Sequence, residues 1–185
     1  MGSPNRRISP LWKPLECAIG ISDRVVGVRL KRAEVVDDFL PRLGGFPGLK
    51  SLNLSRSGIT DEGMRDVPRL TSLEELDLSY TAITDDCMPQ VGKLMRLREL
   101  DLGHTRVCGR GFHRLKALPD LEKLTLVFTP IRDDALEPLK AIRTLSLCNV
   151  WACRHLSRQG TEGFQAARPD CRLFGLDPLK PHWDL

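Results

Sequence analysis

A block of leucines recurs every 24 residues through the middle of the chain. Its copies begin at Leu49, Leu73, Leu97 and Leu121, and each copy has leucine at its first, fourth and sixth residue. An unvarying period of this length is typical of architectures in which every copy is one structural unit stacked on the next. We number the positions of each copy from 0 at these leucines. The period predicts a single solenoid domain.

Seven positions of each copy are expected to point into a core: 0, 3, 5, 10, 15, 18 and 21. All are apolar in four successive copies, the first of which begins at Val25 and has valine at positions 0 and 3. Positions 3 and 5 alternate as in a strand, whereas positions 15 and 18 have helical spacing. Each copy is therefore predicted to form a strand, a turn and a short helix. Stacking would give a parallel sheet on a concave face and helices on a convex face.

The boundaries follow from where this pattern begins and fails. Residues 1–24 are predicted to be an N-terminal arm and cap, in which Trp12 and Leu15 cover the end of the core. Residues 25–147 hold the repeats, with about six strands, and the last strand is predicted to open early, at Ile142. Residues 148–185 are expected to form an irregular insertion (148–160) and a C-terminal cap.

Two polar residue types recur at fixed positions of the copies. Aspartates precede the predicted helical turns, where a carboxylate accepts free backbone N–H groups: Asp37, Asp61, Asp85 and Asp133. Hydroxyl residues follow the strands, where they are expected to satisfy buried backbone groups of the turns: Ser57, Thr81, Thr105 and Thr129. Both sets are predicted to stabilise the repeat.

The segments Ile59-Thr-Asp-Glu-Gly-Met64 and Ile83-Thr-Asp-Asp-Cys-Met88 extend the leucine block in two copies. Together with that block they resemble the L-x-x-L-x-L-x-x-T-x-I-T-D-x-G-L repeats of bacterial leucine-rich repeat proteins of the planctomycete type. The resemblance covers residues 25–175 and includes a closing segment, Arg168-Pro-Asp-Cys-Arg172. It implies a curved, right-handed α/β leucine-rich repeat solenoid that acts as an interaction module and not as an enzyme.

Composition narrows the function classes. Lys and Arg number 28 and Asp and Glu 24, a balance that disfavours nucleic acid as the main partner. No apolar run is long enough to span a membrane. Six cysteines without a C-x-x-C pair, and no apolar leader, suggest reduced thiols in a cytoplasmic protein. Glycine-rich phosphate loops are absent from the sequence, and no cofactor is expected.

Strand positions 2, 4, 6 and 7 are expected to line the concave face, where three zones emerge. The first zone is basic, with Arg29, Lys31, Arg32 and Arg56; the second is acidic, with Glu75, Asp77, Glu99 and Asp101; the third is a ridge of Tyr80, His104 and Phe128. Carboxylates on strands about 4.8 Å apart repel one another unless basic groups or a ligand compensate their charge. Exposed rings usually mark contacts with a partner. The face is predicted to bind a protein or a basic, partly extended peptide.

Other interpretations of these residues stay open at this stage. The charges could simply be solvated, or the contact of a regulatory or targeting subunit could be Trp151 and the insertion at 148–160. A hydrolase-like site would use His104 with Asp101 or Asp77, and Ser79. A zinc site would use Cys148, Cys153, His155 and Cys171, although their spacing departs from known patterns. We assign no catalytic residue and no metal ligand.

Overall fold

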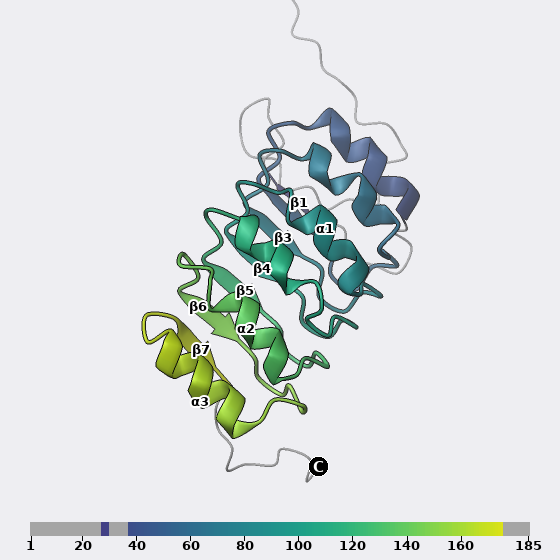
Figure 1. Cartoon of the computed structure of the whole chain (residues 1–185). Helices are drawn as coiled ribbons and strands as arrows, with labels where there is room; N and C mark the ends of the chain where they lie inside the picture. The colour runs from purple at the N-terminus through teal and green to yellow at the C-terminus, as the bar shows by residue number, and fades with distance from the viewer. Residues whose placement is uncertain (1–26, 30–36, 176–185) are drawn as a thin grey trace, which may run out of the picture.

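The computed structural model describes residues 27–29 and 37–175 of the chain. Their strands form one open parallel sheet in the order β1 to β7, and short helices stack along the opposite side of each repeat (Figure 1). The fold is a leucine-rich repeat solenoid, as predicted. The arm and cap residues Trp12 and Leu15 lie outside the described residues, as do Val25, Leu30 and Val35 of the first copy.

Each strand is three residues long, and in the first five strands these are positions 2 to 4 of the repeat, which pair with their equivalents in the adjacent strands. The strands are β1 (Gly27–Arg29), β2 (Ser51–Asn53), β3 (Glu75–Asp77), β4 (Glu99–Asp101), β5 (Lys123–Thr125), β6 (Leu147–Asn149) and β7 (Arg172–Phe174). The sequence pattern predicted about six. The additional strand, β7, lies in the segment that we had assigned to the C-terminal cap.

The helical segments are short and mostly of the 3-10 type. They are η2 (Asp37–Gly45), η3 (Gly63–Arg65), η4 (Val67–Arg69), η5 (Asp85–Cys87), α1 (Met88–Val91), η6 (Phe112–Ala117), η7 (Asp133–Ala135), α2 (Leu136–Leu139) and α3 (Arg158–Ala167). No helix in the described part of the chain combines the length and apolar character needed to cross a membrane.

The core runs the length of the stack between the sheet and the helices. The predicted inward positions of copies two to four are all buried, and Leu76 and Leu100 at its centre are each only 2% exposed. In the first copy Phe46 is partly buried and packs against the core. A residue at a given position therefore contacts its equivalents one repeat away, so that the apolar surface of each repeat is covered on both sides.

The hydroxyls after the strands act as predicted. The side chains of Ser57, Thr81, Thr105 and Thr129 are buried, and each donates to the backbone carbonyl three residues earlier at 2.6 Å. In the next repeat Cys153 takes over this position, and its thiol donates to the carbonyl of Leu126. These turns therefore keep buried carbonyl groups satisfied without the amide side chain found in many solenoids.

The recurring aspartates were predicted to cap the helical turns that follow them, but their carboxylates bind the next repeat instead. The Asp61 carboxylate accepts bonds from the backbone N–H and the hydroxyl of Thr84, one repeat further on. The other members of this row bind in the same way: Asp37 to Thr60, Asp85 to Cys108, and Asp133 to Ser157. These carboxylates therefore link each turn to the turn of the next repeat.

Repeat four breaks this aspartate row. Position 12 is Gly109, whose φ of +96° lies in the left-handed region, and a Cβ there would lie 2.2 Å from the Cβ of Ala135. In the following repeat, the position that elsewhere donates a hydroxyl or thiol holds Arg132. The acceptor and its donor are thus absent together.

The strand register corrects our prediction for the sixth repeat. Leu147, Cys148 and Asn149 pair with Lys123, Leu124 and Thr125, which keeps the step at 24 residues and places position 0 at Leu145. Ile142, predicted to open the strand, is instead position 21 of the fifth repeat, and no residues are missing. Residues 148–160 accordingly belong to a sixth repeat and comprise the end of β6, the turn after it and the start of α3. Leu147 pairs with Arg172, so the last step has one extra residue.

Helix α3 and β7 cover the C-terminal end of the core. The N-cap of α3 is Ser157, whose hydroxyl accepts the N–H of Gly160. Arg168, at the end of α3, is fully buried, and its guanidinium donates to the backbone carbonyls of Ile142, Arg143 and Leu145. An exposed carboxylate, Asp170, pairs with the same guanidinium at 2.9 Å.

Candidate protein-binding face

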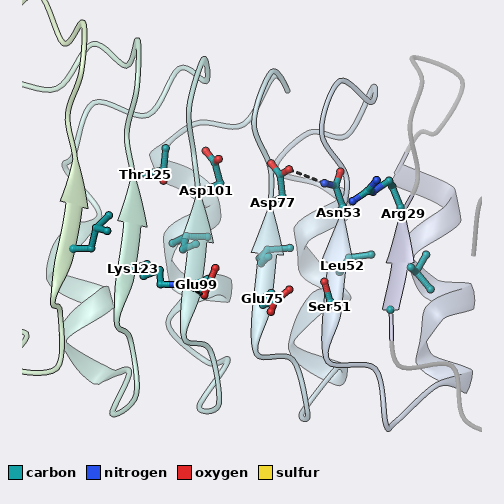
Figure 2. Close-up of a pocket in the computed structure, with 15 residues that line it drawn as sticks. Arg29, Ser51, Leu52, Asn53, Glu75, Asp77, Glu99, Asp101, Lys123 and Thr125 are labelled. Atoms are coloured by element: carbon teal, nitrogen blue, oxygen red, sulfur yellow. Dashed lines mark hydrogen bonds and ion pairs between the residues drawn. The ribbon is translucent and has the colours of Figure 1, made fainter. Parts of the chain in front are cut away.

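The sheet lines an open hollow of about 610 Å³ on the concave face of the solenoid. Two rows of side chains cross it, one from strand position 4 and one from strand position 2 (Figure 2). The position 4 row holds Arg29, Asn53, Asp77, Asp101 and Thr125. The position 2 row holds Ser51, Glu75, Glu99 and Lys123. Since the strands are in register, each side chain in a row lies beside its equivalent in the next repeat.

Asp77 is held by partners within the protein. Its carboxylate accepts a bond from the side-chain amide of Asn53 at 2.7 Å, and bonds from the backbone N–H and hydroxyl of Ser79. Asn53 has the same arrangement with Ser55. This carboxylate is therefore compensated without a ligand, contrary to what its place in the acidic zone led us to expect.

Asp101 is less well compensated. The residue two positions on is Gly103, so the Asp101 carboxylate accepts the backbone N–H at 2.8 Å but has no hydroxyl to bind. Burial raises the pKa of Asp101, and the negative charge of Asp77 raises it further. Among the described residues, the Asp101 carboxylate accepts this one hydrogen bond, whereas that of Asp77 accepts three.

The position 2 carboxylates also differ from each other. Glu99 forms an ion pair with Lys123, and this contact raises the pKa of the lysine. The side chain of Glu75 is exposed and forms no hydrogen bond or ion pair with any of the described residues, although its charge contributes to the raised pKa of Lys123. The acidic zone thus contains two carboxylates with unmet capacity, Glu75 and Asp101, on neighbouring strands.

A row of stacked side chains follows the strands, at position 7 of four repeats and at position 6 of the sixth. Tyr80 stacks on His104 with 3.9 Å between ring centroids, and His104 stacks on Phe128 at 4.5 Å. Trp151 meets Phe128 edge to face at 5.1 Å, and the guanidinium carbon of Arg56 lies 3.9 Å from the centroid of Tyr80. We call Arg56, Tyr80, His104, Phe128 and Trp151 the ring row.

The backbone of the ring row is unusual. Position 7 has a positive φ of 55° to 59° at Arg56, Tyr80, His104 and Phe128. Side chains in this left-handed conformation cost about 1–2 kcal/mol each, which glycine would avoid. Stacking offsets part of this cost, because rings at identical positions of adjacent repeats lie at the distance that suits ring contacts.

The three predicted zones are assembled only in part. Arg29 lies in the position 4 row, but Lys31 and Arg32 lie outside the described residues. Arg56 covers Tyr80 and so belongs to the ring row. The rings Tyr80, His104 and Phe128 do form a ridge, and the structure adds Trp151 to its end. Trp151 had been predicted as a separate contact in an insertion.

The register correction also changes which residues of the sixth repeat face the hollow. A strand that opens at Ile142 would place Thr144, Ser146, Cys148 and Asn149 at positions 2, 4, 6 and 7, but these positions hold Leu147, Asn149, Trp151 and Ala152. Cys148 is fully buried instead of lining the face. Asn53, Lys123 and Thr125 also line the hollow, although the sequence did not mark them as binding residues. Their strand positions follow from the repeat, but their hydrogen-bond and ion-pair partners do not.

Neither the hydrolase-like nor the zinc arrangement forms. His104 makes ring contacts and no side-chain hydrogen bond with Asp101 or Asp77, while the Ser79 hydroxyl donates to Asp77. Cys148 and Cys171 are buried, and burial raises the pKa of both thiols. No group of His, Cys, Asp or Glu able to hold a metal ion occurs in residues 27–29 and 37–175. The cysteines among these residues are free thiols.

The fold and its concave face define the class as a leucine-rich repeat solenoid. Residues 49–67 and 69–86 match the family described as Leucine Rich repeat. A search of curated proteins found no match to the chain.

Solved structures show the same fold at low sequence identity. An internalin (inlF) from Listeria monocytogenes is similar with a TM-score of 0.55 and 18% identity, covering 72% of this chain and 36% of that one. A leucine-rich repeat protein of Leptospira interrogans has a TM-score of 0.58 and 21% identity, with 72% and 33% covered. Internalin C2 from Listeria monocytogenes has a TM-score of 0.56 and 18% identity, and the match covers 87% of this chain and 77% of that one. The chain thus spans about a third of the first two proteins.

Proposed function

We propose that the protein is a non-enzymatic interaction module whose concave face binds a protein or a basic peptide. The observation that carries the proposal is the pair of undercompensated carboxylates, Glu75 and Asp101, in an open hollow. Ammonium and guanidinium groups form charge-assisted hydrogen bonds with carboxylates of this kind. The hollow is long, shallow and open, which suits a segment of polypeptide better than a small molecule.

The strands leave room for an extended ligand that crosses several repeats. Equivalent side chains recur at the strand spacing of about 4.8 Å, whereas side chains on one face of an extended peptide recur at roughly 6.6 Å. A ligand running across the strands would therefore match roughly every third or fourth repeat. Glu75 and Asp101 belong to adjacent repeats and different rows, so they are suited to bind two donors or one guanidinium placed between them.

The test uses charge reversal in the hollow. The variant Glu75→Lys plus Asp101→Lys leaves the Asp77 contacts intact, and its control, Asp38→Lys plus Asp120→Lys, changes the net charge equally at exposed sites elsewhere. The probe is a pool of synthetic basic peptides, and fluorescence anisotropy measures their binding. Binding to the parent and control, with a loss of roughly tenfold or more in the hollow variant, supports the proposal. Equal binding to all three folded proteins would contradict it.

A further inference from the structure

Large apolar side chains are exposed in one place more than elsewhere. The described part of the chain has four of them, and three are in the ring row: Tyr80 (43% exposed), Phe128 (38%) and Trp151 (43%). The fourth, Met95, lies in the loop after α1. Exposed rings gathered into one row indicate a contact surface more strongly than scattered ones.

The way the rings stack restricts what they can bind. Arg56 comes from the repeat before Tyr80 and His104 from the repeat after it, so both faces of the phenol ring are covered. His104 is likewise covered by Tyr80 and Phe128. The exposed surface of these two rings is therefore their edge. Ring edges carry partial positive charge, whereas a ligand cation prefers a ring face. The row suits apolar or negatively charged groups.

The turns that follow the ring row change their charge in the fourth repeat. Positions 12 and 13 are acidic in the neighbouring repeats, as Asp61-Glu62, Asp85-Asp86 and Asp133-Asp134, but are Gly109-Arg110 here. Arg106, two residues after His104, adds a second positive charge in the same turn. Arg132 adds a third in the next turn.

These arginines are available to a partner. Arg106, Arg110 and Arg132 are exposed and form no ion pair with any residue that the structure describes. Backbone contacts between repeats hold two of these residues in place. The N–H of Arg106 donates to the carbonyl of Ile83, and Arg132 forms a β-bridge with His155 in the next repeat. The exposed acids at positions 12 and 13 of the neighbouring repeats are Glu62, Asp86 and Asp134, and Glu62 is paired with Arg65. The carboxylates of Asp85 and Asp133 are bound by the repeats that follow them.

We propose that the ring row and Arg106, Arg110 and Arg132 form a second binding surface, for an acidic segment of a partner protein with apolar side chains among its carboxylates. We call this surface the ring edge. The apolar side chains of the partner contact the exposed edges of the aromatic rings, and its carboxylates pair with the three guanidinium groups. It uses charges opposite to those of the hollow, so it goes beyond the proposed function and does not depend on it.

The experiment crosses two peptide pools with two variant pairs. Both pools contain leucine and phenylalanine at equal length, one with Asp and Glu and the other with Lys and Arg. The ring-edge variant is Arg106→Glu plus Arg132→Glu. Its control, Arg96→Glu plus Lys116→Glu, makes the same charge change at exposed sites elsewhere. Circular dichroism checks that each variant is folded, and fluorescence anisotropy measures binding.

The acidic pool is expected to bind the parent and the control, and to bind the ring-edge variant roughly tenfold more weakly or worse. Phe128→Ala should also weaken binding of this pool, which plain charge attraction would not predict. Absence of binding to the folded parent, or equal binding to parent, control and ring-edge variant, overturns the proposal. The basic pool with Glu75→Lys plus Asp101→Lys tests the hollow separately, so either surface can fail without the other.

Discussion

The rings of Tyr80 and His104 lie nearly parallel, with 3.9 Å between their centroids and 11° between their planes. On the far side of Tyr80 lies the guanidinium of Arg56. A cation, a phenol and an imidazole are therefore placed in sequence by three repeats, at the same position of each. This arrangement exposes the imidazole of His104 to the charge of Arg56, which is 48 positions away in the sequence.

Burial within the stack lowers the pKa of His104, and the charge of Arg56 lowers it further. A lowered histidine pKa means that the unfolded chain binds the proton more readily. The stabilising contribution of neutral His104 is thus complete above pH about 6.5 and is lost as the pH falls through the folded-state pKa. Arg56→Gln should raise the pKa of His104 in an NMR titration, while Arg42→Gln should leave it unchanged. No rise in the first variant would mean that burial alone causes the shift.

Gly103→Ser should give Asp101 the hydroxyl that Ser79 gives Asp77. The new Cβ would lie 3.1 Å from Oδ1 of Asp101, so the carboxylate must move by a few tenths of an ångström. The raised pKa of Asp101 means that its favourable contribution is present below pH about 3.9 and is lost as the pH rises through the folded-state pKa. The variant should lower this pKa and increase stability at pH 7. Gly103→Ala adds the same Cβ without the hydroxyl, and equal effects of both variants would refute this explanation.

Leu76→Ala and Leu100→Ala should each lower the free energy of unfolding by about 2–5 kcal/mol, because each leaves a cavity at the centre of the stack. Urea denaturation measures the loss. Met95→Ala is the matched exposed control and should change stability by less than about 0.5 kcal/mol. A core variant that loses under about 1 kcal/mol would show that these leucines pack less closely than described.

Arg168→Met should lower the free energy of unfolding by about 3–5 kcal/mol, since it removes the guanidinium bonds to three backbone carbonyls at the C-terminal end of the core, of which Ile142 retains the N–H of Leu145. Asp170→Asn removes only the exposed partner of Arg168 and should cost less than about 1 kcal/mol. Thermal unfolding of both variants gives the comparison. Similar losses would show that the ion pair matters more than the carbonyl contacts.

Much of the fold could be predicted from one chain because the repeat presents its own alignment. Residues such as Leu52, Leu76 and Leu100 share a position and therefore a neighbourhood, and their burial follows from alternation along a strand. The prediction failed at the sixth repeat, where Cys148 and Val150 stand in place of leucines and Ile142 offered a false start. Pairing with β5 decides that register, and the pairing is a contact between segments 24 residues apart.

The candidate site shows the same division. The positions that face the hollow could be predicted, because side-chain direction depends on local strand geometry. The sequence did not show which carboxylates have partners within the protein. Glu99 pairs with Lys123, and Asp77 accepts a hydrogen bond from Asn53, and both contacts are between neighbouring strands. The rings were expected as a ridge, but their stacking and the inclusion of Trp151 depend on distances between repeats.

The sequence alone therefore determined the period, the inward positions and the class of fold, because these depend on a pattern within each repeat. The tertiary structure decided which polar groups bind one another, which faces of the rings stay exposed, and that residues 148–160 continue the solenoid. Those properties depend on contacts between repeats, and each contact requires two side chains whose separation no local pattern records.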